Sequence, residues 1–396
     1  MSPIRDPIHG YIEISPYIEE LLDTRTMQRL RNVKQLGWTN LVYPGANHTR
    51  FEHSLGTYYL ASKVSAELSR EERMEIEIAA LLHDIGHGPY SHDSEDIIEF
   101  YTRRKHMDVK FLLEKEEIST ILDKYGISAS AISSHIMGKT KIGQIVNGTL
   151  DVDRMDYLIR DSYYTGVAYG MVDYSHLLRN FKFHDDNIVL FHRGLKSAES
   201  LLMSRFLMYP SVYNHHVGRI AGAMFVNALD VAIQENDLDP THLQLIDDYE
   251  LNVLMRGYNK YSSEMIDRLN NRNLFKRAIY VGFDLVDKSI VKYAKAHKEI
   301  ESEIARLAGI DSGYVLVDIP KVPEFKEKNV KVLMENEQLK YVDNVSELVR
   351  IIEQSYASDW RMGVYTLPEH REKVAGIARD YFNVEKVAKQ AKLEVA

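Results

Sequence analysis

Apolar residues recur at helical spacing over most of residues 16–180, which predicts a mainly α-helical region. One helix is expected within SPYIEELLDTRTMQRLRNVKQ, where Ser15 and Pro16 form a cap and first-turn pair. Two more are expected within YPGANHTRFEHSLGTYYLASKVSAEL and REERMEIEIAALLHDIG, and the second of these is expected to end at Gly86.

The pattern changes along the rest of the chain. FKFHDDNIVLFHRG alternates in the way of a small β-hairpin, with its turn at residues 185–187, and long helices then resume with an interruption or kink at Pro210. Beyond residue 245 helices mix with strand-like runs such as GYVLVDIPKV, VKVLMENEQLKYV and WRMGVYTL. We therefore predict a mainly α fold with small β-hairpins, a helical core over residues 1–245, and a C-terminal α+β lobe over 246–396.

The amino-acid composition limits the location, the metal ligands and the binding partners that can be expected. The chain has 396 residues, of which 45% are hydrophobic, and it shows neither a signal peptide nor a long apolar run, so a cytoplasmic protein with no membrane contact is expected. Because it has no cysteine, any metal must be held by imidazole and carboxylate groups. A net charge of −9 argues against stable nucleic-acid binding, although the basic segment 25–50 is either a solvated helix face or a phosphate site.

Histidines concentrate in one part of the chain. Six of the 16 fall within residues 48–106, and ALLHDIGHGPYSH places an adjacent His83 and Asp84 where glycines end a helix. A zincin-like reading, with His83 and His87 as ligands on one helix, is rejected because Gly86 breaks the helix inside the motif. Further ligands are expected from His53 and from the carboxylates of LDVDRMDYLIRDSYYTG. The alternative for this stretch is an ordinary amphipathic helix whose carboxylates pair with Arg154 and Arg160.

Six blocks in order resemble the deoxynucleoside triphosphate triphosphohydrolase branch of the HD-domain phosphohydrolases. They are DPIHGYIEI, DTRTMQRLRNVKQLG, YPGANHTRFEHSLG, LLHDIGHGPYSH, DVDRMDYLIRDSYYTG and NRNLFK, and the resemblance is strong over about residues 3–220. It implies that residues 1–245 form a helical HD-domain catalytic core and that the lobe over 246–396 has a regulatory or oligomerisation role. It also implies one divalent metal ion, which could be Mn, Fe, Ni, Zn or Mg, held by His53, His83, Asp84 and Asp153.

The same resemblance implies a nucleotide site. The groups near the triphosphate, with catalytic roles, would be His87, His92, His106 and Glu95. The vertebrate enzyme of this branch, called the vertebrate relative below, has a shorter aspartate in place of Glu95. Phosphate oxygens would bind Arg50, Arg154 and Arg205, with Arg154 in place of a family lysine. The deoxyribose would be selected by Gln35, Tyr157, Asp161 and Tyr213, next to Tyr209, where the vertebrate relative has histidine.

The reaction that follows is attack of a metal-activated water on the α-phosphorus of a dNTP, which releases deoxynucleoside and triphosphate. A phosphodiesterase or nucleotidase acting on another ester, and a non-catalytic nucleotide sensor, are the alternatives that a turnover assay separates. The resemblance also implies a homo-oligomer, a dimer or tetramer, with GTP or dGTP as effector. The effector would bind Asp23, Gln28, Arg31, Arg272 and Lys276, while Ser2 replaces a family lysine.

Overall fold

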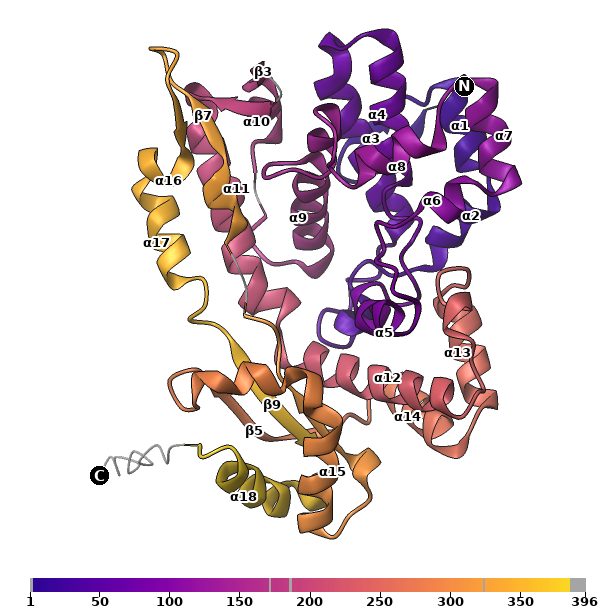
Figure 1. The fold of residues 1–396 in the computed structure, drawn as a ribbon, viewed down its shortest axis with the longest axis vertical. Helices are drawn as coiled ribbons and strands as arrows, with labels where there is room; N and C mark the ends of the chain where they lie inside the picture. Colours follow the sequence, from indigo (N-terminus) through magenta and orange to yellow (C-terminus); the bar gives the residue numbers. More distant parts are fainter. Residues whose placement is uncertain (1–2, 171, 185–186, 323–324, 385–396) are drawn as a thin grey trace. The chain divides into compact units, whose positions relative to one another are not determined.

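A computed structural model describes residues 3–170, 172–184, 187–322 and 325–384 (Figure 1). Two compact units are present, the first formed by residues 1–272 with 325–354 and the second by residues 273–324 with 355–396. The composition change near residue 245 therefore lies within the first unit, because α13 (Asp248–Gly257) packs on α14 (Lys260–Asn270), which in turn packs on α12 (His216–Gln234). Ser2, Asp185 and Asp186 lie outside the described residues.

The first unit is a helical core. It begins with a two-stranded antiparallel hairpin, β1 (Ile4–Asp6) and β2 (Gly10–Ile12), which the hydrophobic pattern did not predict. The helices that follow are α1 (Pro16–Leu22), α2 (Arg25–Arg29), α3 (Arg50–Val64), α4 (Arg70–Leu82), α5 (His92–Thr102), α6 (Lys110–Leu113), α7 (Glu116–Lys124), α8 (Ala129–Ile136), α9 (Val152–Thr165) and α10 (Tyr174–Arg179). The prediction of a mainly α fold is confirmed.

Two of the predicted helix boundaries were wrong. The single helix expected after Ser15 is split into α1 and α2, because the chain leaves the helix after Asp23 and the Thr24 side chain accepts from the Met27 N–H to cap a new one. The α4 helix ends at Leu82 rather than at Gly86, and His83 is its C-cap residue. His83 and Asp84 therefore leave the helix before the glycines, which lets both side chains turn toward one centre.

The predicted interruption at Pro210 is confirmed. The α11 helix (Leu195–Met208) passes into a π-helical turn (Tyr209–Tyr213) before α12 starts at His216. Helix α12 is long and apolar enough to cross a membrane by length and composition alone, but most of it is buried inside the protein. It is thus a core helix of this unit, packed on α5 and α14.

A late segment of the chain returns to the first unit through a sheet. The predicted hairpin is present as β3 (Phe181–His184) and β4 (Asn187–Phe191), and β4 pairs in parallel with β7 (Lys331–Leu333), whose other neighbour is β8 (Leu339–Tyr341). Helices α16 (Val342–Val345) and α17 (Glu347–Ser355) follow β8. This pairing joins residues that lie more than 140 positions apart in the sequence, with Leu190 opposite Val332.

The second unit has its own α+β core. Its antiparallel sheet has the order β5 (Lys276–Gly282), β9 (Arg361–Thr366) and β6 (Val315–Asp318), and α15 (His297–Ala308) and α18 (Arg371–Tyr381) pack on it. The core includes Ile279, Ile304, Trp360, Met362 and Val364. The strand-like runs beyond residue 245 thus fall into two different sheets, β6 and β9 here and β7 and β8 in the first unit.

Candidate metal centre

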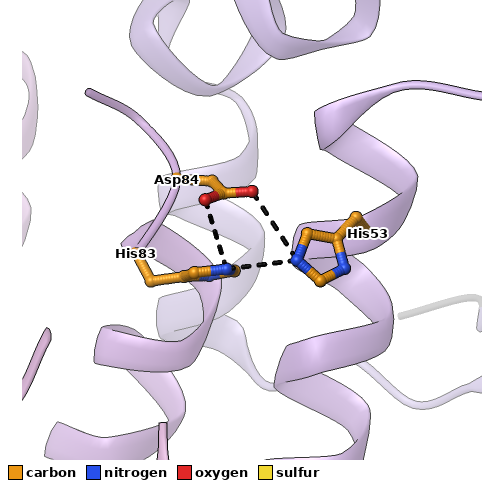
Figure 2. Close-up of side chains that lie close together, drawn as sticks. All are labelled: His53, His83 and Asp84. Atoms are coloured by element: carbon orange, nitrogen blue, oxygen red, sulfur yellow. Dashed lines mark hydrogen bonds and ion pairs between the residues drawn. The ribbon is translucent and has the colours of Figure 1, made fainter. Parts of the chain in front are cut away.

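Four predicted metal ligands converge inside the first unit. Figure 2 shows His53, from α3, facing His83 and Asp84, which follow α4, and the three ligand atoms lie within 4.8 Å of one another. The Nε2 atoms of His53 and His83 are 3.3 Å apart, and Asp84 oxygens lie 3.6 and 3.4 Å from them. Asp153, near the start of α9, places its Oδ1 atom 2.9 Å from His53 Nε2 and 3.6 Å from His83 Nε2.

This donor set fits a divalent cation. Donor atoms bound about 2.0–2.2 Å from one ion lie roughly 3 to 3.5 Å from one another, and these separations are close to that range. Both imidazoles also present Nε2 to the centre because their Nδ1 atoms are engaged, with the Asp156 carboxylate at 2.8 Å for His53 and the Ala80 carbonyl oxygen at 2.8 Å for His83. Nitrogen and carboxylate donors without thiolate suit Mn, Fe, Ni, Zn or Mg.

The electrostatics favour a cation. Burial raises the pKa of Asp84, but the positive charges of Arg50 and His83 outweigh it and hold that pKa well below its usual value. Burial lowers the pKa of His53, but hydrogen bonds to Asp153 and Asp156 reverse this and raise it to about 10. Asp84 and Asp153 are therefore ionised at neutral pH, and a divalent cation bound at the imidazole nitrogens would take the place of the proton that His53 holds without it.

Behind His53 lies a buried ionic network. The Asp156 carboxylate also accepts from His9 Nε2 at 2.7 Å and from the Arg160 guanidinium at 2.9 and 3.0 Å, while Arg160 donates to Asp6 at 2.8 Å. All four of these residues are less than 10% exposed. His9, Asp6 and Arg160 were not predicted from the sequence. The motif DPIHG carries the first two, but nothing local to it shows that it reaches α9.

A group of imidazoles extends from the metal centre. The rings of His87 and His106 stack at 4.2 Å, and His92 lies 5.0 Å from His87. Burial and the nearby Arg50 charge hold the pKa of His87 well below its usual value, so this ring is neutral. Glu95 contacts His106 and accepts from His92 at 2.7 Å, and these hydrogen bonds outweigh burial and lower its pKa.

A buried donor beside the metal ligands has no hydrogen-bond partner among the described residues. Arg50 is 3% exposed and donates from Nη1 to Asp84 and from Nε to Ser91, at 2.8 and 2.9 Å, but its Nη2 atom is unmatched. The Nε2 atom of His87 lies 3.3 Å from the ionised Asp84, so this neutral ring carries its proton on Nε2 and its buried Nδ1 atom is an acceptor. A buried unmatched guanidinium donor next to a cation site indicates an anionic ligand.

Arg154 and Arg205 also come together, but through a residue that the sequence analysis missed. Glu327, which is 1% exposed, contacts both guanidinium groups. It belongs to the segment that returns to the first unit through β7, so no local signal pointed to it. The contacts made by Tyr209 include a hydrogen bond from Arg205 Nη2 to its hydroxyl at 3.2 Å.

Three of the residues predicted to select the sugar form one cluster. Tyr213 donates to Asp161 at 2.8 Å, and its ring centroid lies 6.2 Å from that of Tyr157. The other oxygen of Asp161 lies 2.7 Å from His48 Nε2, and the His48 carbonyl accepts from the Gln35 N–H at 3.0 Å. The buried Gln35 Oε1 has no partner among the described residues. The chain thus brings aromatic faces and hydrogen-bonding groups together near the metal centre.

The residues predicted for an effector are only partly brought together. Gln28 accepts from Arg31 Nε at 2.7 Å, and Asp23 is exposed at the end of α1. Arg272 donates to the Leu41 carbonyl at 2.9 Å within the first unit. Lys276 is the first residue of β5 and belongs to the second unit.

Comparisons with known proteins agree with this geometry. A family model described as HD domain matches residues 50–161, and one described as HD associated region matches residues 172–393. An uncharacterized protein of Methanocaldococcus jannaschii is 39% identical over 93% of this chain and 80% of its own length. The deoxynucleoside triphosphate triphosphohydrolase SAMHD1 homolog of Dictyostelium discoideum is 32% identical over 80% of this chain and 66% of its own. The crystal structure of a phosphohydrolase from Bacteroides thetaiotaomicron has a TM-score of 0.72 and 26% identity, covering 92% of this chain and 99% of that one.

Proposed function

The chain belongs to the HD-domain phosphohydrolase family, and on this premise we propose that it hydrolyses deoxynucleoside triphosphates to deoxynucleoside and triphosphate. The observation that carries the proposal is the placement of an unmatched buried guanidinium donor, Arg50 Nη2, beside a four-residue cation site. A phosphate ester satisfies both requirements, because its oxygens bind the cation and accept from Arg50.

The cation would be held by His53, His83, Asp84 and Asp153. When bound, a divalent cation polarises a phosphoryl oxygen and lowers the pKa of a water molecule. The protein orients two of these ligands through the Asp156 carboxylate and the Ala80 carbonyl, and keeps both ligand carboxylates ionised. Arg50 neutralises charge on the phosphate oxygens as it develops.

The proton for the departing 5′-oxygen would come from the imidazole group next to the centre. The Glu95 carboxylate contacts both His92 and His106 and orients these two rings, either of which is a candidate proton donor. His87 is neutral and lies between these rings and Asp84, with its Nε2 atom toward the Asp84 carboxylate. Water adds to the α-phosphorus, the bond from that phosphorus to the 5′-oxygen breaks, and the proton passes to the 5′-oxygen.

The deoxyribose would lie on the cluster formed by Tyr157, Tyr213 and Asp161, with Gln35 beside it. A ring packed under the sugar leaves no room for a 2′-hydroxyl, the Asp161 carboxylate accepts from the 3′-hydroxyl, and the oxygen of that hydroxyl can accept from the Gln35 amide. The site would therefore discriminate against ribonucleotides by steric exclusion rather than by an unmatched polar group.

A turnover assay tests the proposal. Protein reconstituted separately with Mn, Fe, Ni, Zn and Mg is incubated with dNTPs, NTPs, a deoxynucleoside monophosphate and a phosphodiester, and the products are separated by ion-exchange chromatography. We expect deoxynucleoside and triphosphate from dNTPs and little product from the other compounds. Release of product from the monophosphate or diester alone would establish one of the other phosphohydrolase activities, and no turnover with any metal would favour a nucleotide sensor.

We also propose that a guanine nucleotide activates the protein as a homo-oligomer. The adjacent Gln28 and Arg31 support this, because an amide and a guanidinium can bind a base edge and a phosphate, and Asp23 supplies a carboxylate on the same segment. The test is the rate with and without GTP or dGTP, measured together with light scattering. A monomer whose rate neither nucleotide changes would refute this part alone.

A further inference from the structure

Glu327 is a buried carboxylate with no assigned role. It lies in a short 3₁₀ turn (Lys326–Asn329) that precedes β7, and the parallel pairing of β7 with β4 brings this turn to the first unit. The residue is 1% exposed, whereas its neighbours Lys326 and Lys328 are exposed. An ionised group is buried in this way only when it has charged partners.

Its partners are the two arginines predicted to bind phosphate. Arg205, on α11, contacts Glu327 Oε1 through Nη1, and Arg154 places its Nε atom 3.7 Å from the same oxygen. Arg154 directly follows the metal ligand Asp153 on α9. Its Nη1 atom is held by the Gly148 and Thr149 carbonyl oxygens at 3.0 and 2.8 Å, so the guanidinium has little freedom to turn away from Glu327.

A carboxylate between two guanidinium groups occupies the place that a phosphate would take. Carboxylate and phosphate present the same kind of negatively charged oxygen acceptors, and arginine binds both with the same donors. Both arginines can engage the phosphate chain of a ligand fully only if Glu327 gives up its contacts. Arg205 also donates to the Tyr209 hydroxyl at 3.2 Å, and the Tyr209 ring centroid lies 5.5 Å from that of Tyr213, which places this ion pair next to the nucleotide site proposed above.

We propose that Glu327 is an intramolecular competitor for the phosphate chain of the substrate, so that binding exchanges its carboxylate for phosphate on Arg154 and Arg205. This proposal rests on the proposed function for the identity of the site. Glu327 thereby determines how strongly the site binds ligands that reach both arginines. The segment that carries it connects the phosphate site to β7 and β8, so any change that displaces this segment raises substrate affinity.

The test uses the full chain and inorganic tripolyphosphate as the probe, so that it does not depend on nucleotide turnover. Its dissociation constant is measured by calorimetry for the wild-type protein, for Glu327→Gln and for Glu353→Gln. The last variant removes the same charge from an exposed pair, because Glu353 accepts from Lys328 at 2.9 Å on the same segment. We expect Glu327→Gln to bind tripolyphosphate about tenfold or more tightly, the worth of a hydrogen bond to a charged group, and Glu353→Gln to match the wild type.

Unchanged or weaker binding by Glu327→Gln would overturn the proposal, since a residue that merely holds the arginines in place would weaken binding when removed. Hydrogen exchange on the wild-type protein tests the same idea without a mutation. Tripolyphosphate is expected to speed hydrogen exchange at the amides of residues 326–330 as the carboxylate is displaced. Unchanged or slower hydrogen exchange there would contradict the replacement of Glu327 by phosphate on the two arginines. If tripolyphosphate binding and amide exchange behave as expected but the wild-type protein hydrolyses no nucleotide, the proposed activity is refuted and the role of Glu327 stands.

Discussion

The Asp156→Asn substitution tests how the protein orients a metal ligand. Asp156 is fully buried, and one of its oxygens lies 2.8 Å from His53 Nδ1, where it fixes the ring with Nε2 toward the metal centre. An amide keeps the shape of the side chain but removes the charge. Loss of such a partner weakens metal binding by about 10- to 100-fold, which corresponds to about 1.4 to 2.8 kcal/mol.

The substitution also leaves Arg160 with one carboxylate in place of two, so a loss of stability of about 3 kcal/mol is expected as well. Asp6→Asn is the matched control, because Asp6 accepts from the same guanidinium at 2.8 Å but does not contact His53. Metal affinity is measured by competition with a chromogenic chelator, and circular dichroism shows that each variant is folded. Equal metal affinity in folded Asp156→Asn and wild type, or an equal loss in Asp6→Asn, would refute this account of the network.

Burial raises the pKa of Asp93 from 3.8 to about 7, although the carboxyl accepts a hydrogen bond from the Trp38 N–H. The unfolded chain therefore loses this proton more readily, and the free energy of unfolding falls as pH rises from about 4 to 7. Asp93→Asn is expected to reduce that fall by a few kcal/mol, on the order of 1.4 per pKa unit. If chemical denaturation gives the variant and the wild type the same dependence of stability on pH, the carboxyl is not buried as described. Tyr213→Ala is expected to reduce the preference for dGTP over GTP by roughly tenfold, a difference of about 1.4 kcal/mol, because it removes the ring next to Tyr157. If the ratio of the initial rates with dGTP and GTP at equal concentration is unchanged, the Tyr213 ring does not select the sugar. Asp23→Ala is expected to abolish stimulation by GTP while leaving the unstimulated rate within about twofold, since a surface carboxylate contributes little to folding, and full stimulation of this variant would remove Asp23 from the effector site.

The fold was predictable where local patterns control it. Amphipathic spacing predicted the helical core and the alternation of FKFHDDNIVLFHRG predicted the β3–β4 hairpin, since both depend on residues close in sequence. Tertiary contacts decided the rest. The break between α1 and α2 depends on a Thr24 cap within a continuous apolar pattern, and the parallel pairing of β4 with β7 joins distant segments that no local signal connects.

The residues of the candidate site were also predictable only in part from the sequence. His83 and Asp84 stand out in the sequence as an adjacent pair at a helix end, and His53 was expected from the histidine cluster. The resemblance to a known family selected Asp153 among the carboxylates of α9. Residues that act through them were harder to find, because their side chains are informative only once the chain is folded. Glu327 reads in the sequence as one acid in a lysine-rich turn, and only its burial against two arginines distinguishes it.

The proposed reaction is tested by hydrolysis of dGTP in ¹⁸O-labelled water by the metal-reconstituted protein, with the products identified by mass spectrometry and ³¹P NMR. We expect intact triphosphate carrying one ¹⁸O atom and unlabelled deoxyguanosine, because water attacks the α-phosphorus and the bond to the 5′-oxygen breaks. The same assay with Asp84→Ala is expected to give no product. Orthophosphate or pyrophosphate as the released product, or label in the deoxyguanosine, would contradict the proposed reaction.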